Sequence, residues 1–295
     1  MSKCFLVDGH NLAFRCFYGI PLLGAQNFPT NAILGAVKIL TKIIDMEKPA
    51  HMVVFFDKGR DPKRQALLPE YKANRVEVPD PVKIQIPVIK EFAYALGCTV
   101  IERFGVEADD LMASFAQKYR SQFDEILIFS ADKDLAQCIE DNIYQMIPDG
   151  NRNGIGNRLD RVGVLEKFGV YPEQIVDYLS LIGDQADNIP GIRGVGPKTA
   201  SAWIKQFGSI EKILWESSAI NPARFRSILK ESEEVLHRNQ QLIALNRNIN
   251  DIYCETLQSD ERQYAQLVEF YQLTSLRKSP IESKTFQPDF FNHFE

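Results

Sequence analysis

Carboxylates occur in this sequence wherever an apolar, strand-like run ends. The residues that follow four such runs, directly or within a few positions, are Asp8, Asp57, Glu107, Asp109, Asp110, Asp132 and Asp134. If the runs are strands of an open parallel sheet, these groups gather beyond the carboxyl ends of the strands. Two like charges about 4 Å apart repel by roughly 4 kcal/mol at an effective dielectric constant of about 20, so such a cluster predicts bound divalent cations. Ligands that are all oxygen suit Mg²⁺ or Mn²⁺ rather than zinc.

A shared metal site of this kind favours hydrolysis of a phosphodiester. Two metal ions roughly 3.5–4 Å apart can activate a water molecule, orient the phosphate and stabilise both the attacking and the leaving oxygen. Each carboxylate taken alone could instead be a helix cap or a solvated turn residue, and Glu107 and Asp109 would also suit a first helical turn. Their joint occurrence at four strand ends favours the shared site. The histidines do not compete, because His10, which is near Asp8, is interpreted as a loop residue.

A second pattern, at residues 183–203, could bind phosphate. Residues 191–196 read as a tight, glycine-rich hairpin between two helices, and Pro197 suits the first turn of the second helix. Backbone N–H groups and a helix N-terminus bind phosphates without reading bases, and Lys198 and Lys205 can add positive charge. Nucleotide binding by a P-loop is excluded, because Pro197 interrupts the required spacing and no strand precedes the glycines. An ordinary helical hairpin turn is the remaining alternative.

Two further carboxylates lie just upstream of this hairpin. Asp184 and Asp187 could reach the carboxylate cluster and so couple phosphate docking to the metal site.

The elements that position these residues are predicted from hydrophobic periodicity. Strands are predicted at residues 4–7, 52–56, 98–101, 126–129 and 143–147, with helices at 31–45, 82–96 and 108–119 between them. This alternation predicts an α/β fold with a mainly parallel central sheet flanked by helices. Residues 148–158 are a turn-rich bridge, and from 160 to about 245 only helical patterns occur.

The segment after Asp57 breaks the alternation. Between Asp57 and Arg75 there are six basic and three acidic residues, a net charge of +3 within a chain whose net charge is −5. A basic, weakly helical excursion at residues 58–81 is typical of a functional lid or of a mobile segment. We therefore expect an α/β core at 1–158 that includes this excursion, a helical region at 159–250 with the hairpin at 191–196, and a C-terminal extension or tail at 251–295.

Composition excludes several classes of protein. The five scattered cysteines form no C-x-x-C pair, which favours free thiols in a reducing compartment. No apolar run approaches the roughly 18 residues of a membrane span, and the N-terminus lacks a signal-peptide pattern. The sequence thus predicts a soluble cytoplasmic protein without a membrane partner.

The chain resembles the 5′-nuclease, or flap endonuclease, family of bacteria and phages, and more narrowly the 5′→3′ exonuclease domain of bacterial DNA polymerase I. The resemblance covers about residues 1–250. Its marks are VDGHN at 7–11, FD at 56–57, YKANR at 71–75, EADD at 107–110, ADKD at 131–134, GDQADN at 183–188 and GVGPKTA at 194–200. It implies a PIN-like nuclease core, a helical arch formed by residues 58–81, and a helix-three-turn-helix element at the hairpin. A stand-alone nuclease and an excised polymerase domain both stay open.

The resemblance also implies the roles of the carboxylates. One Mg²⁺ or Mn²⁺ ion would be held by Asp8, Asp57, Glu107 and Asp109. A second would be held by Asp132, Asp134 and Asp187, with Asp109 or Asp110 contributing directly or through water and Asp184 as an outer partner. Asp8 and Asp109 would thus take part in catalysis.

The same resemblance assigns contacts to nucleic acid. Arg64 and Lys72 would approach the scissile phosphate, and Phe14 would either lie near an unpaired terminal base or pack in the core. The remaining expected DNA-binding residues are Arg75, Gly191, Ile192, Gly194, Val195, Gly196, Lys198, Thr199 and Lys205. Backbone carbonyls of the hairpin would bind a K⁺ ion that touches a duplex phosphate.

The resulting prediction is a monomeric, metal-dependent, structure-selective 5′ nuclease. Its partners would be DNA with 5′ flaps, nicks or 5′ ends, including RNA–DNA hybrids, in the nucleoid of a bacterial cytoplasm. It would act as a 5′→3′ exonuclease and 5′-flap endonuclease that removes primers and flaps in replication and repair. The alternatives are a non-catalytic DNA-binding scaffold of the same fold and a ribonuclease with the same sheet architecture.

Overall fold

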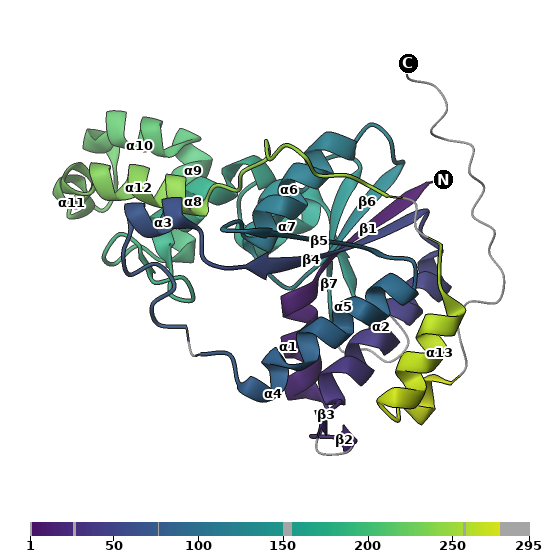
Figure 1. The fold of residues 1–295 in the computed structure, drawn as a ribbon. Helices are drawn as coiled ribbons and strands as arrows, with labels where there is room; N and C mark the ends of the chain where they lie inside the picture. The colour runs from purple at the N-terminus through teal and green to yellow at the C-terminus, as the bar shows by residue number, and fades with distance from the viewer. Residues whose placement is uncertain (1, 26–27, 76, 150–154, 256–257, 278–295) are drawn as a thin grey trace.

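The computed structural model describes residues 2–25, 28–75, 77–149, 155–255 and 258–277, and a six-stranded sheet forms the centre of this described part (Figure 1). Its strands, in order across the sheet, are β5 (Thr99–Phe104), β4 (His51–Lys58), β1 (Lys3–Asp8), β6 (Glu125–Phe129), β7 (Ile143–Ile147) and β8 (Asn157–Leu159). Neighbouring strands are parallel except for β7 and β8. The predicted mainly parallel sheet and its five predicted strands are confirmed.

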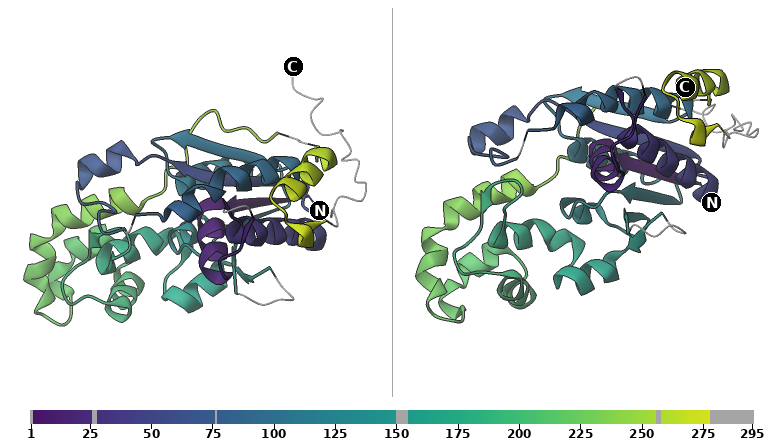
Figure 2. Two further views of the ribbon diagram at one scale, coloured as in Figure 1. Left: turned by 60° about the horizontal axis from the view of Figure 1, so that its bottom comes forward. Right: turned by 90° about the horizontal axis from the view of Figure 1, so that it is seen from below.

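Helices cover both faces of this sheet. One face packs against α1 (Gly9–Gly19), α2 (Asn31–Glu47), α4 (Asp80–Lys83), α5 (Gln85–Ala95) and α13 (Glu261–Phe270), and the other against α6 (Ala108–Tyr119) (Figure 2). In β1, Phe5 and Val7 belong to the first core while Cys4 and Leu6 belong to the second. Strands buried on both faces read as continuous apolar runs, which explains why they were predictable.

Three elements near the sheet differ from the sequence-based expectation. Helix α1 begins directly after Asp8, where we predicted no helix, because the Asp8 carboxylate caps it. The three-residue edge strand β8 pairs antiparallel with β7 and begins at the end of the predicted turn-rich bridge, of which residues 150–154 lie outside the described part. A short pair, β2 (Gly24–Ala25) and β3 (Phe28–Pro29), connects α1 to α2.

The helical region has a hydrophobic core of its own. Its helices are α7 (Arg161–Phe168), α8 (Ile175–Ile182), α9 (Pro197–Phe207), α10 (Ile210–Trp215), α11 (Phe225–Glu231) and α12 (Glu233–Ile243). A two-residue strand pair, β9 (Gly183–Asp184) and β10 (Ile189–Pro190), joins α8 to the hairpin. The excursion contributes α3 (Pro62–Leu67), and its residues Leu68 and Tyr71 are buried in the core of the helical region. The excursion is therefore packed against the helical region (Figure 1).

The predicted C-terminal extension contains a packed helix. The backbone N–H of Asp260 donates to the carbonyl of Ala95 at 2.9 Å, and the rings of Tyr264 and Phe92 lie 5.7 Å apart. These contacts hold α13 against α5. Residues 256–257 and 278–295 of the extension lie outside the described part. Within the part that is described, no helix is both long and apolar enough to cross a membrane.

Candidate active site

Asp8 occupies the end of the central strand β1 and is held by two hydrogen bonds. Its Oδ1 accepts the N–H of Asn11 at 2.9 Å, and its Oδ2 accepts the hydroxyl of Ser130 at 3.0 Å. Burial raises the pKa of Asp8 to about 7, and the charges of Asp57 and Asp132 add to this shift. The structure thus brings the ends of β1, β4 and β6 together, as the parallel order predicts.

Asp57 and Asp109 lie, like Asp8, at the carboxyl ends of the parallel strands. Asp57 Oδ1 accepts the N–H of Ala108, the first residue of α6, at 2.7 Å. Burial raises the pKa of Asp109 well above its usual value, and the next largest contributions are the charges of Asp132 and Asp8. The carboxylates predicted from separate strand ends therefore repel one another in the folded chain.

The loop after β6 fixes two further carboxylates. Asp132 Oδ1 accepts the N–H of Asp134 at 2.9 Å, and Gln145 Nε2 donates to the carbonyls of Ser130 and Asp132 at 3.0 and 2.6 Å. Burial is the main cause that raises the pKa of both Asp132 and Asp134. Asp134 also opens the 3-10 helix η1 (Asp134–Cys138), which fixes its direction.

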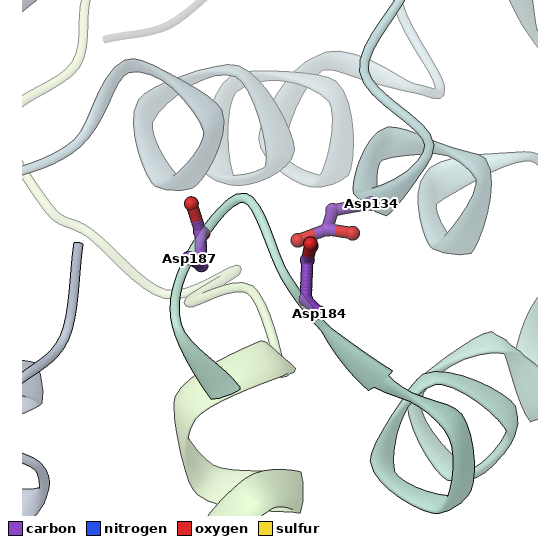
Figure 3. Close-up of side chains that lie close together, drawn as sticks. All are labelled: Asp134, Asp184 and Asp187. Atoms are coloured by element: carbon purple, nitrogen blue, oxygen red, sulfur yellow. The ribbon is translucent and has the colours of Figure 1, made fainter. Parts of the chain in front are cut away.

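Asp134, Asp184 and Asp187 form the tightest acidic group in the described part of the chain. One carboxylate oxygen from each lies within 4.8 Å of the others. Figure 3 shows Asp184 at the end of β9 and Asp187 on the turn between β9 and β10, with Asp134 beside Asp184. Asp134 Oδ1 is buried and has no hydrogen-bond partner among the described residues. A buried, unpartnered oxygen beside two other carboxylates fits a hard divalent cation.

Cations from the excursion contact two of the acidic residues, Glu107 and Asp187. Lys72 Nζ lies 2.6 Å from Glu107 and 3.8 Å from Asp187, and Arg75 also pairs with Asp187. The Tyr71 hydroxyl lies 3.1 Å from Glu107 and 3.3 Å from Asp187. Burial alone would lower the pKa of Lys72, but the charges of Glu107 and Asp187 outweigh it and raise the pKa.

Three hydrogen bonds tie the end of the excursion to the β9–β10 turn. Lys72 N–H donates to the carbonyl of Asp187 at 2.9 Å, Asn74 Nδ2 to that of Gln185 at 2.6 Å, and Asn188 Nδ2 to that of Glu70 at 2.9 Å. Lys72 has a φ of 58°, in the left-handed region that non-glycine residues rarely adopt. We call the three hydrogen bonds between the excursion and the β9–β10 turn the clip.

Arg64 and Asp110 form a buried ion pair. Arg64 is 5% exposed, and its Nη1 lies 2.6 Å from Asp110 and 2.8 Å from Glu107. Its Nε donates to the carbonyl of Leu242 at 3.0 Å, and Asp110 Oδ1 accepts the N–H of Asn246 at 2.8 Å. In this structure Arg64 and Asp110 face each other. The contact of Arg64 with the phosphate and the contact of Asp110 with a metal ion therefore stay predictions.

The hairpin at 191–196 packs its apolar residues inward. Ile192 and Val195 are buried, and Val195 N–H donates to the Ile192 carbonyl at 2.9 Å, so only backbone of these residues can meet a ligand. Gly191 is required by close approach, because a Cβ there would lie 2.2 Å from the carbonyl carbon of Ile182. Gly194 has a φ of 82°, which favours glycine.

The N-terminus of α9 is open to a ligand. Its cap residue Gly196 has no side chain, so no side-chain acceptor of the cap satisfies the first N–H groups, which include those of Lys198 and Thr199. The side chains of Lys198 and Lys205 are exposed. This arrangement suits an anion.

Phe14 lies on α1 and is partly buried against the core of the sheet. Its ring centroid is 6.2 Å from that of His10. Both readings of Phe14 are compatible with this position, and a contact with a base stays a prediction.

Several residues around the site were not recognised in the sequence. His10 is on a helix rather than in a loop, and its Nδ1 accepts the N–H of Asp57 at 3.1 Å. Ser130 and Gln145 position the carboxylates, and Lys133 Nζ lies 3.0 Å from Asp184. Tyr71 had the clearest available signal, because it adjoins Lys72 in the motif at 71–75. His10 and Lys133 also lie inside quoted motifs, at 7–11 and 131–134, whereas Ser130 and Gln145 carry no signal that separates them from ordinary polar residues.

Comparison with known proteins adds family and fold. Residues 3–169 match the family described as "5'-3' exonuclease, N-terminal resolvase-like domain", and residues 170–265 match "5'-3' exonuclease, C-terminal SAM fold". A 5'-3' exonuclease of Aquifex aeolicus is 42% identical over 85% of this chain and 84% of its own length. DNA polymerase I of Caldicellulosiruptor bescii is 34% identical over 86% of this chain, which spans only 29% of that enzyme.

The solved structure of the bacteriophage T5 D15 flap endonuclease, as a pseudo-enzyme-product complex with DNA and metal ions, has a similar fold. Its TM-score is 0.68 at 22% identity, covering 92% of this chain and 99% of that chain. The likeness supports a resolvase-like or PIN-like sheet domain followed by a helical domain.

Proposed function

Because the chain belongs to the 5′-3′ exonuclease family, we propose that it hydrolyses DNA phosphodiesters as a 5′→3′ exonuclease and 5′-flap endonuclease. The observation that carries the proposal is the group Asp134, Asp184 and Asp187, with its unpartnered buried oxygen, at the edge of the sheet that also holds Asp8. A chain without metal-dependent chemistry gains nothing from this concentration of negative charge next to a polyanion.

Two Mg²⁺ or Mn²⁺ ions would fit the donor set. Asp8, Asp57, Glu107 and Asp109 are proposed to hold one of them, and Asp132, Asp134 and Asp187 the other. Asp184 belongs to the group of three carboxylates within 4.8 Å, so we propose for it a closer role than an outer partner. Bound there, the cations would supply positive charge and Lewis acidity at the phosphodiester.

Residues of the chain itself would orient the carboxylates and offset the charge on the phosphate. Ser130 and Asn11 orient the Asp8 carboxylate, and Gln145 fixes the loop that carries Asp132. Lys72 is the cation proposed to offset charge on the scissile phosphate, because it lies among the carboxylates while its side chain is still 16% exposed. A charge that acts mainly in the transition state raises the rate of the chemical step rather than the affinity.

Arg64 is proposed to act through its neighbours. Its guanidinium contacts Asp110 and Glu107, so it would hold the Glu107 carboxylate in position. Arg75 is proposed to leave Asp187 for a DNA phosphate, since half of its side chain is exposed.

The helical region is proposed to bind the duplex. The open N-terminus of α9, with Lys198, Thr199 and Lys205, supports contacts to phosphates. The hairpin carbonyls are proposed to bind K⁺. We propose substrates with 5′ flaps, nicks or 5′ ends, including RNA–DNA hybrids. In such substrates the duplex would bind the helical region while a single strand passes the excursion. We also propose a monomer in a bacterial cytoplasm, acting in primer and flap removal.

Incubation with a 5′-labelled flap duplex tests the proposal. We expect cleavage near the flap junction with Mg²⁺ or Mn²⁺ and none with a chelator, with product ends mapped at single-nucleotide resolution. Binding without cleavage at any divalent-ion concentration would instead identify a DNA-binding scaffold. Cleavage of single-stranded RNA in preference to the DNA flap would favour the ribonuclease.

Metal binding should also change the pH dependence of stability. The pKa of Asp8 is raised from 3.8 to about 7 by burial, so the folded metal-free protein binds a proton that the unfolded chain releases. Its contribution to stability is complete below the unfolded value and is lost as the pH rises through about 7. We expect the increase in Tm caused by Mg²⁺ to be larger at about pH 8 than at about pH 6. Differential scanning calorimetry with and without chelator measures it.

The Asp8→Asn variant is the control for this measurement. It removes one titrating group, so the difference between the two pH values should shrink. An equal increase in Tm at both pH values in the parent protein contradicts the prediction.

A further inference from the structure

Phe104 is an exposed aromatic ring at the carboxyl end of the edge strand β5. It is the last residue of β5 and is 82% exposed, whereas Phe5, Phe55 and Phe56 of the neighbouring strands are fully buried. Phe104 is in register with Lys58 at the end of β4, and the N–H of Gly105 donates to the Lys58 carbonyl at 2.7 Å. The ring therefore lies where the ends of β4 and β5 are hydrogen-bonded to each other and where the excursion begins. We call this place the lip.

The surroundings of this ring are basic. Arg60 and Lys63 are exposed, and within the described part of the chain neither forms a salt bridge with a carboxylate. Both belong to the segment that faces the lip, because Pro62 and the Arg60 carbonyl come within 3.5 and 3.9 Å of a Cβ built at Gly105.

The nearby acids are already engaged. Glu102 pairs with Lys58 and Lys90, and Asp61 caps α3 while lying 3.7 Å from Arg64. The two free cations and the ring therefore remain available to a ligand that is both anionic and aromatic.

The ring is also close to the proposed chemistry along the chain. Phe104 precedes Glu107 by three residues, which span at most about 10 Å, and Lys58 directly follows Asp57. A strand whose phosphate lies at the carboxylates would pass its neighbouring nucleotides over this lip.

We propose that Phe104 is a stacking platform for an unpaired base of the 5′ single strand, with Arg60 and Lys63 binding the phosphates beside it. The inference deepens the proposed function and rests on it, since it assumes a DNA strand at the carboxylates. Aromatic rings stack on any base, so the platform holds a single strand without selecting its sequence. Such a contact suits an enzyme that selects structure rather than sequence.

The test compares Phe104→Ala and Phe104→Trp with the parent protein. The DNA is a 5′-flap duplex with 2-aminopurine in the flap, with Ca²⁺ in place of Mg²⁺, and a nicked duplex without a flap. Phe104→Ala should weaken flap binding about 5- to 10-fold and remove the quenching of 2-aminopurine, while Phe104→Trp keeps both. Affinity for the flap-free duplex should not change. Phe270→Ala is the matched control, because Phe270 is 73% exposed on α13, toward the other end of the sheet (Figure 1).

Equal flap affinity and quenching in Phe104→Ala and the parent protein would overturn the platform. So would a loss of affinity that is the same with and without the flap, because the ring would then serve duplex or fold. Failure of the parent protein to cleave a flap that it binds and quenches would overturn the proposed function and leave the platform standing, so the two failures are distinguishable.

Discussion

Asp187→Ala is expected to slow cleavage by more than about 100-fold while leaving duplex affinity intact or improved. Asp187 supplies one of the three carboxylates within 4.8 Å and also pairs with Arg75. Its removal weakens the proposed metal site and reduces repulsion towards an incoming phosphate. The clip survives, since none of its three bonds uses the Asp187 carboxylate, and the Lys72 N–H donates to the backbone carbonyl of residue 187. Asp8→Ala should be inactive as well, through the other proposed ion.

Single-turnover cleavage of a 5′-flap DNA across a Mg²⁺ titration measures this effect, with affinity determined in Ca²⁺. Asp45→Ala is the matched control, because Asp45 is an exposed aspartate on α2 away from the cluster. A parental cleavage rate for Asp187→Ala at ordinary Mg²⁺ would remove this residue from the active site and leave the second ion unsupported.

Arg64→Ala should lower the free energy of unfolding by roughly 3–5 kcal/mol, because it leaves Asp110 as a buried charge without its partner and removes one of the two cations that pair with Glu107. Adding Asp110→Asn should recover part of the loss, since it removes the unpaired charge. Lys63→Ala, one residue earlier and exposed, should change stability by no more than about 0.5 kcal/mol. Urea unfolding followed by circular dichroism measures all of these variants.

Lys72→Ala provides the contrast on the same segment. Its side chain is less buried than that of Arg64, so we expect it to fold normally and to lose mainly the rate of single-turnover cleavage. Parental stability of Arg64→Ala combined with slow cleavage would restore Arg64 to direct contact with the phosphate. A normal single-turnover rate for Lys72→Ala would make that residue an ordinary phosphate contact.

The sheet and the positions of its carboxylates were predictable because both are local in sequence. Apolar runs such as residues 52–56 mark buried strands, and an aspartate directly after such a run must lie at the edge of the sheet. The partners of the excursion were not predictable. Arg64 meets Asp110, which is 46 positions away, and this choice depends on packing between α3, α6 and α12.

Helices that depend on a neighbour were also missed. Helix α1 starts at an aspartate that was interpreted only as a ligand, although the same carboxylate caps it. The short helix α13 is amphipathic but lies in a segment whose neighbour, α5, is about 170 residues earlier, so its packing leaves little trace in the local pattern.

The clip has a consequence for how this protein could be divided or recombined. Asp134 belongs to residues 3–169, whereas Asp184 and Asp187 belong to residues 170–265, so the acidic group straddles the seam between the two matched regions. Glu70, Lys72 and Asn74 reach across the same seam. A chimaera that took its helical half from a relative would have to carry the matching segment 70–75 along with it, because the clip and the acidic group are each built from both halves.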